Sequence, residues 1–549
     1  MKFDDLIVLI PAIKKSVAFE DDLIRKLNGV SLIQRTISKA CSLVSNTKKV
    51  FVITDSEEIK LVAGRNQTNC FFDNKLIWKQ TSIQGRLLEY IKNNARNHKL
   101  ILIISPYAPL LRKKTLTDAI TKFSGSDEDL LKPITFKKFG ATSLNEKSPL
   151  SFLFKIRKKN FSLTSESFSL IRSKLIFQNR EYKPKISNFE INYNLSEINS
   201  YEDWWICEKL LQRKKILIRV VGDKKLGLGH VFRCLSIAHE ITDHSIEFIT
   251  TKNNQLAIQK LAKSGYSCIV STAKAIERDI LNYNPDLVLN DILNTSEPYV
   301  VKLKKNKIKI VNFEDLGLGA KFSTLTINEL YDKPLIRSGN ILWGNKYFFL
   351  RDEFNDARKN RWNNAVKSLL LTFGGTDQNN YSQIIYSEIK EFCKENNIFL
   401  NIVTGPGYKH FDKLNELVSQ DDNAMLTRST GIISSIMETC QLAIISNGRT
   451  VYELAHMNIP AIVISHHIRE TTHKFSCAEN GFVSVGIFEK GETEKIVKQE
   501  LESLVFSASR RKKLQSKMKK FDFIKNKKKI IRKISNILKS EEKKKDAAI

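Results

Sequence analysis

Residues 215–233 read KILIRVVGDKKLGLGHVFR, and this stretch decides the fold of the larger part of the chain. The apolar run 215–221 is typical of a buried strand, and a helical pattern follows over 233–241. Between them lies a glycine-rich loop that ends at His230. This order predicts an α/β sheet with an anion site, because the N-terminus of a helix offers free backbone N–H groups.

Short apolar runs alternate with helical patterns along the chain, which predicts parallel α/β sheets. One series precedes the opening stretch, a second contains it, and a third follows it. The expected strands are 5–12, 49–54, 99–105, 215–221, 246–250, 286–290, 308–312, 368–373, 399–404, 442–446 and 461–465, with a helix over 32–44.

This pattern divides the 549 residues into four parts. A charged, Trp-containing helical segment at 201–214 closes the first series, and 352–366 connects the second series to the third. From about Ser507 the chain reads as a Lys-rich helix. The expected domains are 1–213, 214–355, 356–505 and a helical tail at 506–549.

The formal charge of +30 suggests a nucleic acid, an anionic membrane or an acidic substrate as partner. Residues 501–549 hold 17 of the 89 Lys/Arg and 5 of the 59 Asp/Glu, so much of the excess is local. The abundance of Lys, Asn and Ile is also typical of low-GC genomes. We therefore do not expect nucleic-acid binding as the main function.

We expect neither a targeting signal nor disulfide bonds from this sequence. No run approaches 18 uninterrupted apolar residues, and two acids precede the first apolar run, so we expect no membrane span and no signal peptide. The eight cysteines lie scattered without a C-x-x-C pair, which favours reduced thiols in a cytoplasmic protein. The sequence leaves the oligomeric state open.

His230 is the catalytic candidate. Gly227 and Gly229 let the backbone approach a ligand closely, and imidazole titrates near neutral pH, so a histidine here can act as a general base. A tight turn with a locally packed histidine fits the same residues, and Gly-x-Gly-His alone does not separate the two interpretations.

Two later loops follow strands in the same way. The loop after 368–373 suits a phosphate or sugar contact, although an ordinary strand–turn–helix junction has the same pattern. The loop after 442–446 leads into a helix start that can bind phosphate, with a glutamate one turn on for a ribose; a capping box is the structural alternative. The candidate residues are Gly374, Gly375, Thr376, Asp377, Gly448, Arg449, Thr450 and Glu453.

A polar cluster follows the last strand, in the segment SHHIRETTH at 465–473. Its members are His466, His467, Arg469, Glu470 and His473. Substrate contact is the preferred interpretation, with a metal site as the alternative.

In order, the motifs GLGH-x-x-R, FGG-[ST]-D and a Thr-x-Tyr-Glu helix make residues 214–505 resemble the UDP-sugar hydrolases of the pseudaminic-acid pathway and related spore-coat polysaccharide proteins. These families belong to the GT-B glycosyltransferase superfamily, which has two Rossmann-like lobes. The resemblance is supported by the stretches 285–291, 311–315, 347–354 and 405–407.

The resemblance implies that His230 activates a water, or an acceptor hydroxyl, for attack on the sugar. It implies that Arg233 and the glycine and Thr-x-Tyr-Glu segments hold a UDP-sugar without a cofactor. Two departures leave both hydrolysis and transfer open: Val221 stands where the family has Asp, and Arg469-Glu470 where it has Asn-Gln.

The first domain resembles the acylneuraminate (CMP-sugar) cytidylyltransferases. The resemblance rests on Ile10-Pro11-Ala12, Leu27-Asn28-Gly29, Thr54-Asp55-Ser56 and Ser105-Pro106-Tyr107. It implies a site for CTP or a CMP-sugar, with Lys14, Lys15, Ser16, Asn28 and Asp55 as the remaining site residues.

Two departures argue against activity of this domain. Ile13-Lys14-Lys15 replaces the family's Arg-Gly-Gly-Ser-Lys loop, which removes close backbone approach and a bidentate phosphate contact. The family's closing acid-x-Asp pair, which helps hold Mg²⁺, reads Glu197-Ile198-Asn199, and a hard cation prefers carboxylate to an amide. We therefore expect this domain to be degenerate and to serve as a binding or assembly module. It would require Mg²⁺ only if it were an active cytidylyltransferase.

Together these patterns predict an enzyme of nonulosonic-acid or surface-glycan biosynthesis that acts on a UDP-linked amino sugar, by hydrolysis with release of UDP. The alternatives are glycosyl transfer in the same cleft, an active cytidylyltransferase in 1–213, and a polyanion-binding protein that works through the tail.

Overall fold

The computed structural model divides the chain into two compact units, Met1–Arg213 and Lys214–Ile549, and each is described by itself. The structure describes residues 2–14, 19, 21–74, 81–141, 157–178, 182–191, 197–428 and 430–539. The predicted site residues Lys15 and Ser16 lie outside these ranges. No helix in the described ranges has the length and apolar content needed to cross a membrane.

Unit 1 is built on a mixed sheet with the strand order β10-β7-β9-β6-β1-β4-β5, and β8 pairs with β7. Its strands are β1 (Leu6–Pro11), β4 (Val50–Thr54), β5 (Asn69–Phe72), β6 (Leu100–Ile104), β7 (Leu130–Ala141), β8 (Arg157–Thr164), β9 (Phe168–Arg172) and β10 (Ile186–Glu190), with a short hairpin of β2 (Lys26–Leu27) and β3 (Val30–Ser31). Its helices are α1 (Leu32–Cys41), α2 (Glu57–Arg65), α3 (Thr81–Ala95), α4 (Lys113–Ser124) and α6 (Tyr201–Gln212).

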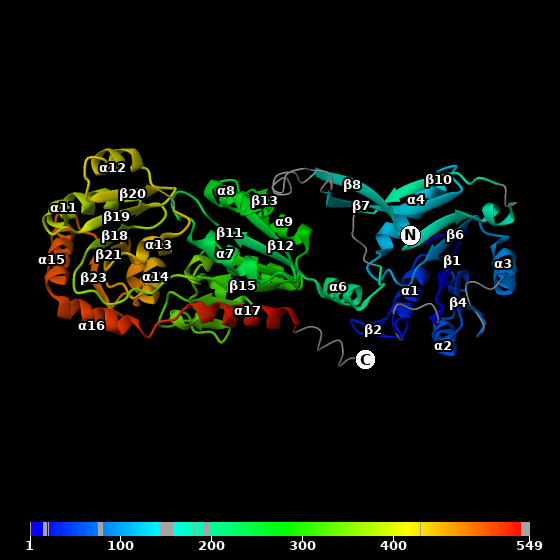
Figure 1. Ribbon diagram of the computed structural model, residues 1–549. Coiled ribbons are helices and arrows are strands. Elements are labelled where there is room, and N and C mark those ends of the chain that lie inside the picture. The colour runs from blue at the N-terminus through cyan, green and yellow to red at the C-terminus, as the bar shows by residue number, and fades with distance from the viewer. Residues whose placement is uncertain are drawn as a thin grey trace. The chain divides into compact units, whose positions relative to one another are not determined.

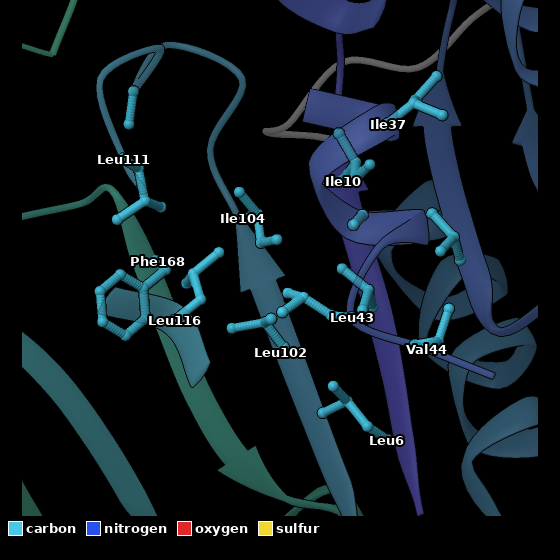
Figure 2. Close-up of a cluster of buried hydrophobic side chains, with 14 of the residues drawn as sticks. Leu6, Ile10, Ile37, Leu43, Val44, Leu102, Ile104, Leu111, Leu116 and Phe168 are labelled. Carbon is cyan, nitrogen blue, oxygen red and sulfur yellow. The ribbon is translucent and has the colours of Figure 1, made fainter. Parts of the chain in front are cut away.

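The central strands of unit 1 pair in parallel, as predicted, because fully apolar runs such as β1 can be buried on both faces. Figure 2 shows part of the core: Leu6 and Ile10 of β1 lie near Leu102 and Ile104 of β6, with Ile37 of α1 beside them. The antiparallel strands β7, β8 and β9 were not predicted.

The N-terminal lobe of unit 2 is a parallel sheet with the order β13-β12-β11-β14-β15-β16-β17. Its strands are β11 (Lys215–Val220), β12 (Ser245–Thr251), β13 (Cys268–Ser271), β14 (Leu287–Asp291), β15 (Lys309–Phe313), β16 (Leu325–Asn328) and β17 (Ile341–Trp343). Its helices are α7 (Gly229–Glu240), α8 (Gln255–Lys263), α9 (Ile276–Tyr283) and α10 (Glu297–Lys305).

The C-terminal lobe repeats this plan with the parallel order β20-β19-β18-β21-β22-β23. Its strands are β18 (Ser368–Thr372), β19 (Phe399–Thr404), β20 (Ala424–Arg428), β21 (Leu442–Ser446), β22 (Ala461–Ser465) and β23 (Phe482–Ile487). Its helices are α11 (Tyr381–Glu395), α12 (Phe411–Val418), α13 (Ile433–Met437), α14 (Thr450–Met457), α15 (Thr493–Phe506) and α16 (Ala508–Met518).

Both strand orders are those of a Rossmann fold, so the predicted pair of Rossmann-like lobes is confirmed. In each lobe the first strand lies between the second and the fourth. The connections on its two sides leave in opposite directions, and the crevice that opens at the carboxyl ends of these strands is where such sheets bind ligands. The crevices lie between β11 and β14 and between β18 and β21.

The segment expected as a separate tail is helical but belongs to the lobes. After α16 the chain returns to the N-terminal lobe as α17 (Ile524–Lys539), which lies along β15 in Figure 1. Ile530, Ile534 and Leu538 are buried in the core of that lobe. The apolar face of α17 is therefore part of the fold.

Candidate active site

A cleft of about 590 Å³ lies between the two lobes of unit 2. Loops that follow β11, β18 and β21 form much of its wall, as expected for two facing crevices. Of the predicted contacts, the lining includes Gly229, His230, Gly374, Gly375, Thr376, Gly448, Arg449, Thr450, Glu453, Arg469 and Glu470. The structure thus brings together residues that are more than 200 positions apart.

His230 lies in the first turn of α7 and reaches the cleft with a side chain that is 10% exposed. Its Nδ1 is 2.6 Å from Oδ1 of Asp291, the last residue of β14. An ionised carboxylate only accepts hydrogen bonds, so we assign the proton to Nδ1. Nε2 then carries the lone pair, and a histidine held in this way can accept a proton from a ligand.

Two hydrogen bonds from Arg233 hold the carboxylate of Asp291. Its Nε donates to Oδ2 at 2.7 Å and its Nη2 to Oδ1 at 2.5 Å. The same guanidinium donates to Glu314 Oε2 at 2.9 Å and to Glu329 Oε1. Arg233, Asp291 and Glu329 have fully buried side chains, so the two carboxylates depend on the guanidinium, and the guanidinium on them, for neutralisation of charge.

The electrostatics of this group keep Asp291 ionised. Burial on its own raises the pKa of Asp291, but the charges of Arg233 and His230 and their hydrogen bonds outweigh it and hold the pKa well below the usual range. The pKa of Glu314 is likewise lowered against the effect of burial, chiefly by the charge of Arg233. Asp291 therefore presents a full negative charge to the imidazole.

Ligand atoms of His230, Asp291 and Glu314 lie within 4.8 Å of one another, a spacing that suits a metal ion. The guanidinium of Arg233 already places a cation between the two carboxylates, however, and both are hydrogen-bonded to it. These three side chains therefore do not fit a metal ion in addition to the guanidinium, because two buried cations in contact would repel each other.

The glycine-rich loops of the two lobes touch each other at the edge of the cleft. A Cβ on Gly375 would lie 3.2 Å from Cα of Gly227, which is closer than an ordinary contact, and Gly227 has a φ of 73° that favours glycine. Gln378 Nε2 donates to the backbone oxygen of Lys225 at 2.6 Å across the same junction. Gly227 thus supports the junction and is not part of the cleft lining.

Arg449 and Glu453 line the C-terminal wall, and both form ion pairs there. Arg449 Nη1 donates to Glu329 Oε1 of the N-terminal lobe at 2.8 Å. Glu453 Oε1 lies 3.1 Å from Nη2 of Arg351, in the connection between the lobes. The predicted capping-box alternative is not formed, because Arg449 is the N-cap of α14 and its side chain makes no capping hydrogen bond in the described structure.

Arg469 crosses the cleft to the N-terminal lobe with neutral partners. Nε donates to Tyr331 Oη at 3.0 Å and Nη2 to the backbone oxygen of Glu314 at 3.1 Å. Glu470 accepts from the backbone N–H of His466 at 2.7 Å and so shapes the local turn. Among the described residues, the histidines of this segment are not part of a metal-ligating cluster.

Besides Gly227, two predicted contacts need correction. Arg233 does not line the cleft, because its side chain is fully buried beneath His230 in ion pairs. Asp377 is also buried, and its carboxylate accepts from the backbone N–H groups of Tyr381 and Ser382 at 2.8 and 2.7 Å. Asp377 therefore stabilises the start of α11 and does not reach a ligand.

The structure also adds residues that the sequence analysis did not assign to the site: Asp291, Glu314, Glu329, Arg351 and Tyr331. The first three follow or end strands β14, β15 and β16, whose carboxyl ends meet at the same edge of the sheet. This position was the available signal, and Asp291 and Glu314 are the candidates it could have identified.

In unit 1 the Lys14 side chain pairs with acids. Nζ lies 2.7 Å from Asp21 Oδ1 and 2.7 Å from Glu58 Oε2, and the hydrogen bond to Asp21, followed by that to Glu58, raises the pKa of Lys14. Asp55 accepts from the backbone N–H of Lys14 at 2.7 Å. Asn28 has a φ of 49° and sits with Gly29 in the two-residue turn of the β2–β3 hairpin.

The weak metal candidates of unit 1 have other partners. Glu197 Oε1 accepts from the Ser165 hydroxyl at 2.6 Å, and Asn199 Nδ2 donates to the backbone oxygen of Glu197 at 3.2 Å. Within the described part of unit 1, three metal-ligating side chains do not converge anywhere. Glu197 and Asn199 are therefore engaged in hydrogen bonds within unit 1.

Comparison with known proteins bears on both units. Residues 7–233 match the cytidylyltransferase family, a range that runs past the end of unit 1 into α7. The chain is also 28% identical over 269 residues to an uncharacterised protein of Methanocaldococcus jannaschii, covering 46% of this chain and 55% of that protein.

Two further relatives are named for sugar pathways. Spore coat polysaccharide biosynthesis protein SpsG of Bacillus subtilis is 25% identical over 278 residues, covering 47% of this chain and 80% of SpsG. A Helicobacter pylori protein, named pseudaminic acid cytidylyltransferase and UDP-2,4-diacetamido-2,4,6-trideoxy-beta-L-altropyranose hydrolase, is 22% identical over 339 residues. That match covers 58% of each chain, so the chain spans little more than half the length of two of these relatives.

Among solved structures, MurG of Acinetobacter baumannii aligns with 59% of this chain and 99% of its own, with 13% identity and a TM-score of 0.44.

Proposed function

We propose that unit 2 hydrolyses a UDP-linked amino sugar in surface-glycan or nonulosonic-acid biosynthesis and releases UDP. The observation that carries the proposal is the His230–Asp291 pair, which faces the inter-lobe cleft opposite the glycine loop and helix start of the C-terminal lobe. The name of the Helicobacter pylori relative supports a UDP-linked amino sugar as substrate, and the name of SpsG supports a role in polysaccharide biosynthesis.

In this mechanism His230 Nε2 takes a proton from a water molecule as the water oxygen attacks the anomeric carbon. The bond between that carbon and the diphosphate oxygen breaks, and UDP leaves with the bonding electrons. Asp291 stabilises the imidazolium and keeps its ring oriented, as a carboxylate next to a catalytic histidine does. Gly374, Gly375, Thr450 and the N-terminus of α14 bind the diphosphate.

The direct test is UDP release from a panel of UDP-amino sugars, including UDP-N-acetylglucosamine, in ¹⁸O-labelled water. Attack on carbon places the label in the sugar and none in UDP. His230→Ala abolishes release but keeps UDP binding, as measured by calorimetry. Absence of UDP release by the wild type across the panel would refute hydrolysis.

Glycosyl transfer is the second candidate, because the same base can deprotonate an acceptor hydroxyl in place of water. It is favoured by Arg469, which stands where the resembling hydrolases have Asn and which reaches across the cleft to Tyr331. Addition of acceptor sugars to the same assay separates the two reactions: UDP release that requires an acceptor identifies transfer.

For unit 1 we propose a binding or assembly role without cytidylyl transfer. The family match at 7–233 supports a nucleotide-binding ancestry. Lys14 is paired with two carboxylates, and a CTP triphosphate would have to displace them. Diphosphate release from CTP with Mg²⁺ and a nonulosonic acid, measured on the full chain, would overturn this proposal.

A further inference from the structure

One buried carboxylate connects the two walls of the cleft. Glu329 directly follows β16 and has a fully buried side chain. Its Oε1 accepts from Arg233 Nη1, beneath the catalytic pair, and from Arg449 Nη1, which comes from the other lobe. Because the two guanidinium groups share one oxygen, each would repel the other without the negative charge between them.

The two arginines depend on Glu329 to different degrees. Arg233 keeps Asp291 and Glu314 as partners when Glu329 is neutral. Arg449 has no second carboxylate among the described residues: Nη2 donates to the backbone oxygen of Phe349 at 3.2 Å, and its guanidinium lies 4.5 Å from the centre of the Phe348 ring. The position of Arg449 therefore rests mainly on Glu329.

Arg449 keeps N–H donors that can bind a ligand while Glu329 holds its side chain. A guanidinium has five N–H donors, and two hydrogen bonds, to Glu329 and Phe349, are made here. Arg449 also lines the cleft, close to Thr450 and Gly448. The remaining donors can reach the phosphates of a nucleotide without breaking the bond to Glu329.

Glu329 is itself poorly supported by anything except these arginines. Among the described residues, its Oε2 is buried and makes no hydrogen bond. Burial of an unpaired carboxylate is unfavourable, so Glu329 would be disfavoured at this position without the two cations. The two guanidinium groups are therefore what holds the Glu329 carboxylate in place.

We propose that Glu329 is a positioning residue that holds Arg449 against the diphosphate of the nucleotide and, through Arg233 and Asp291, keeps His230 in place. The inference rests on the proposed function, since it assigns a diphosphate to the Arg449 side of the cleft. It predicts that Glu329 acts on nucleotide binding through Arg449 and on turnover through Arg233.

The test is a double-mutant cycle of Glu329→Gln and Arg449→Gln in the full chain, with UDP affinity from calorimetry and kcat from UDP release. We expect each single variant to weaken UDP binding about 30-fold, and the double variant to bind no more weakly than Arg449→Gln. Glu329→Gln also lowers kcat about tenfold, whereas Arg449→Gln raises KM with a smaller effect on kcat.

The control is a second ion pair outside the cleft, Lys527 with Asp352, which attaches α17 to the inter-lobe connection. Lys527→Gln and Asp352→Asn lower resistance to urea but leave UDP affinity unchanged. The inference would be overturned if the loss of UDP affinity in the double variant equalled the product of the losses in the two single variants. An unchanged UDP affinity in Glu329→Gln would also overturn it. Wild-type protein that binds UDP without turnover refutes the hydrolase proposal and still leaves the affinity cycle to decide on Glu329.

Discussion

Replacement of Asp291 by Asn tests the core of the proposed mechanism, because it keeps the shape of the side chain and removes its charge. Oδ1 of Asp291 lies 2.6 Å from His230 Nδ1. Unit charges centred about 4 Å apart interact by about 4 kcal/mol at an effective dielectric constant of about 20. That energy stabilises the imidazolium that forms in the transition state and is absent in the variant.

A loss of about 4 kcal/mol corresponds to a decrease of about 1,000-fold in kcat. The amide can also turn its NH₂ toward Nδ1, which would force the proton of the imidazole to Nε2 and remove the base. Both effects act on kcat, and UDP affinity stays close to that of the wild type. The assay is steady-state UDP release together with calorimetric titration of UDP.

The matched control is Asp315→Asn, which also neutralises a fully buried carboxylate in the same lobe. Asp315 accepts from Thr295, Asn312 and the backbone N–H of Gly317 and does not contact His230 or Arg233. The Asp315→Asn substitution lowers the free energy of unfolding and leaves kcat within about threefold of the wild-type value. If Asp291→Asn keeps kcat within threefold while His230→Ala is inactive, Asp291 does not support the base and the mechanism is wrong.

Three further outcomes are expected. Arg469→Gln raises KM for the UDP-sugar about tenfold in steady-state assays, because an arginine whose partners within the described residues are neutral is available to a ligand anion; an unchanged KM contradicts this. Burial lowers the pKa of His456 to about 4, so its unfolded state binds more protons between pH 6.5 and pH 4 and stability falls as the pH is lowered. His456→Leu removes up to about 3 kcal/mol of that loss in urea titrations at the two pH values, and an unchanged pH dependence would refute the assignment. Truncation after Phe523 removes Ile530, Ile534 and Leu538 from the core and costs about 5–8 kcal/mol, seen as an aggregated or unfolded lobe by circular dichroism; a folded, active truncation would restore the view of α17 as an independent tail.

The strands that the sequence predicted are those with a local signal. Runs such as 215–221 and 368–373 are apolar throughout because parallel strands are covered on both faces. The edge strand β10 has alternating exposure, and β7 to β9 pair in antiparallel fashion, so neither repeats the strand–helix pattern on which the prediction depended.

The loops that line the cleft were predicted from the same kind of local signal, and with the same limit. Glycine loops after strands identified both walls of the cleft, because the carboxyl ends of parallel strands meet there. The sequence analysis assigned Arg233 to ligand binding, whereas its side chain pairs with Asp291, Glu314 and Glu329. These partners lie 58 to 96 positions away, so no local sequence pattern indicates the ion pairs. The docking of α17 is equally non-local: an amphipathic pattern predicts an apolar face without identifying the surface that it covers.

The return of α17 to the N-terminal lobe has a consequence for synthesis of the chain. Strands β11 to β17 leave the ribosome long before residues 530–538, yet these residues complete the same core. A nascent N-terminal lobe therefore exposes an apolar groove while the whole C-terminal lobe is being made. Of the two lobes of unit 2, we therefore expect the one that is translated first to complete its core last, which leaves it exposed to aggregation until the C-terminal helix is made.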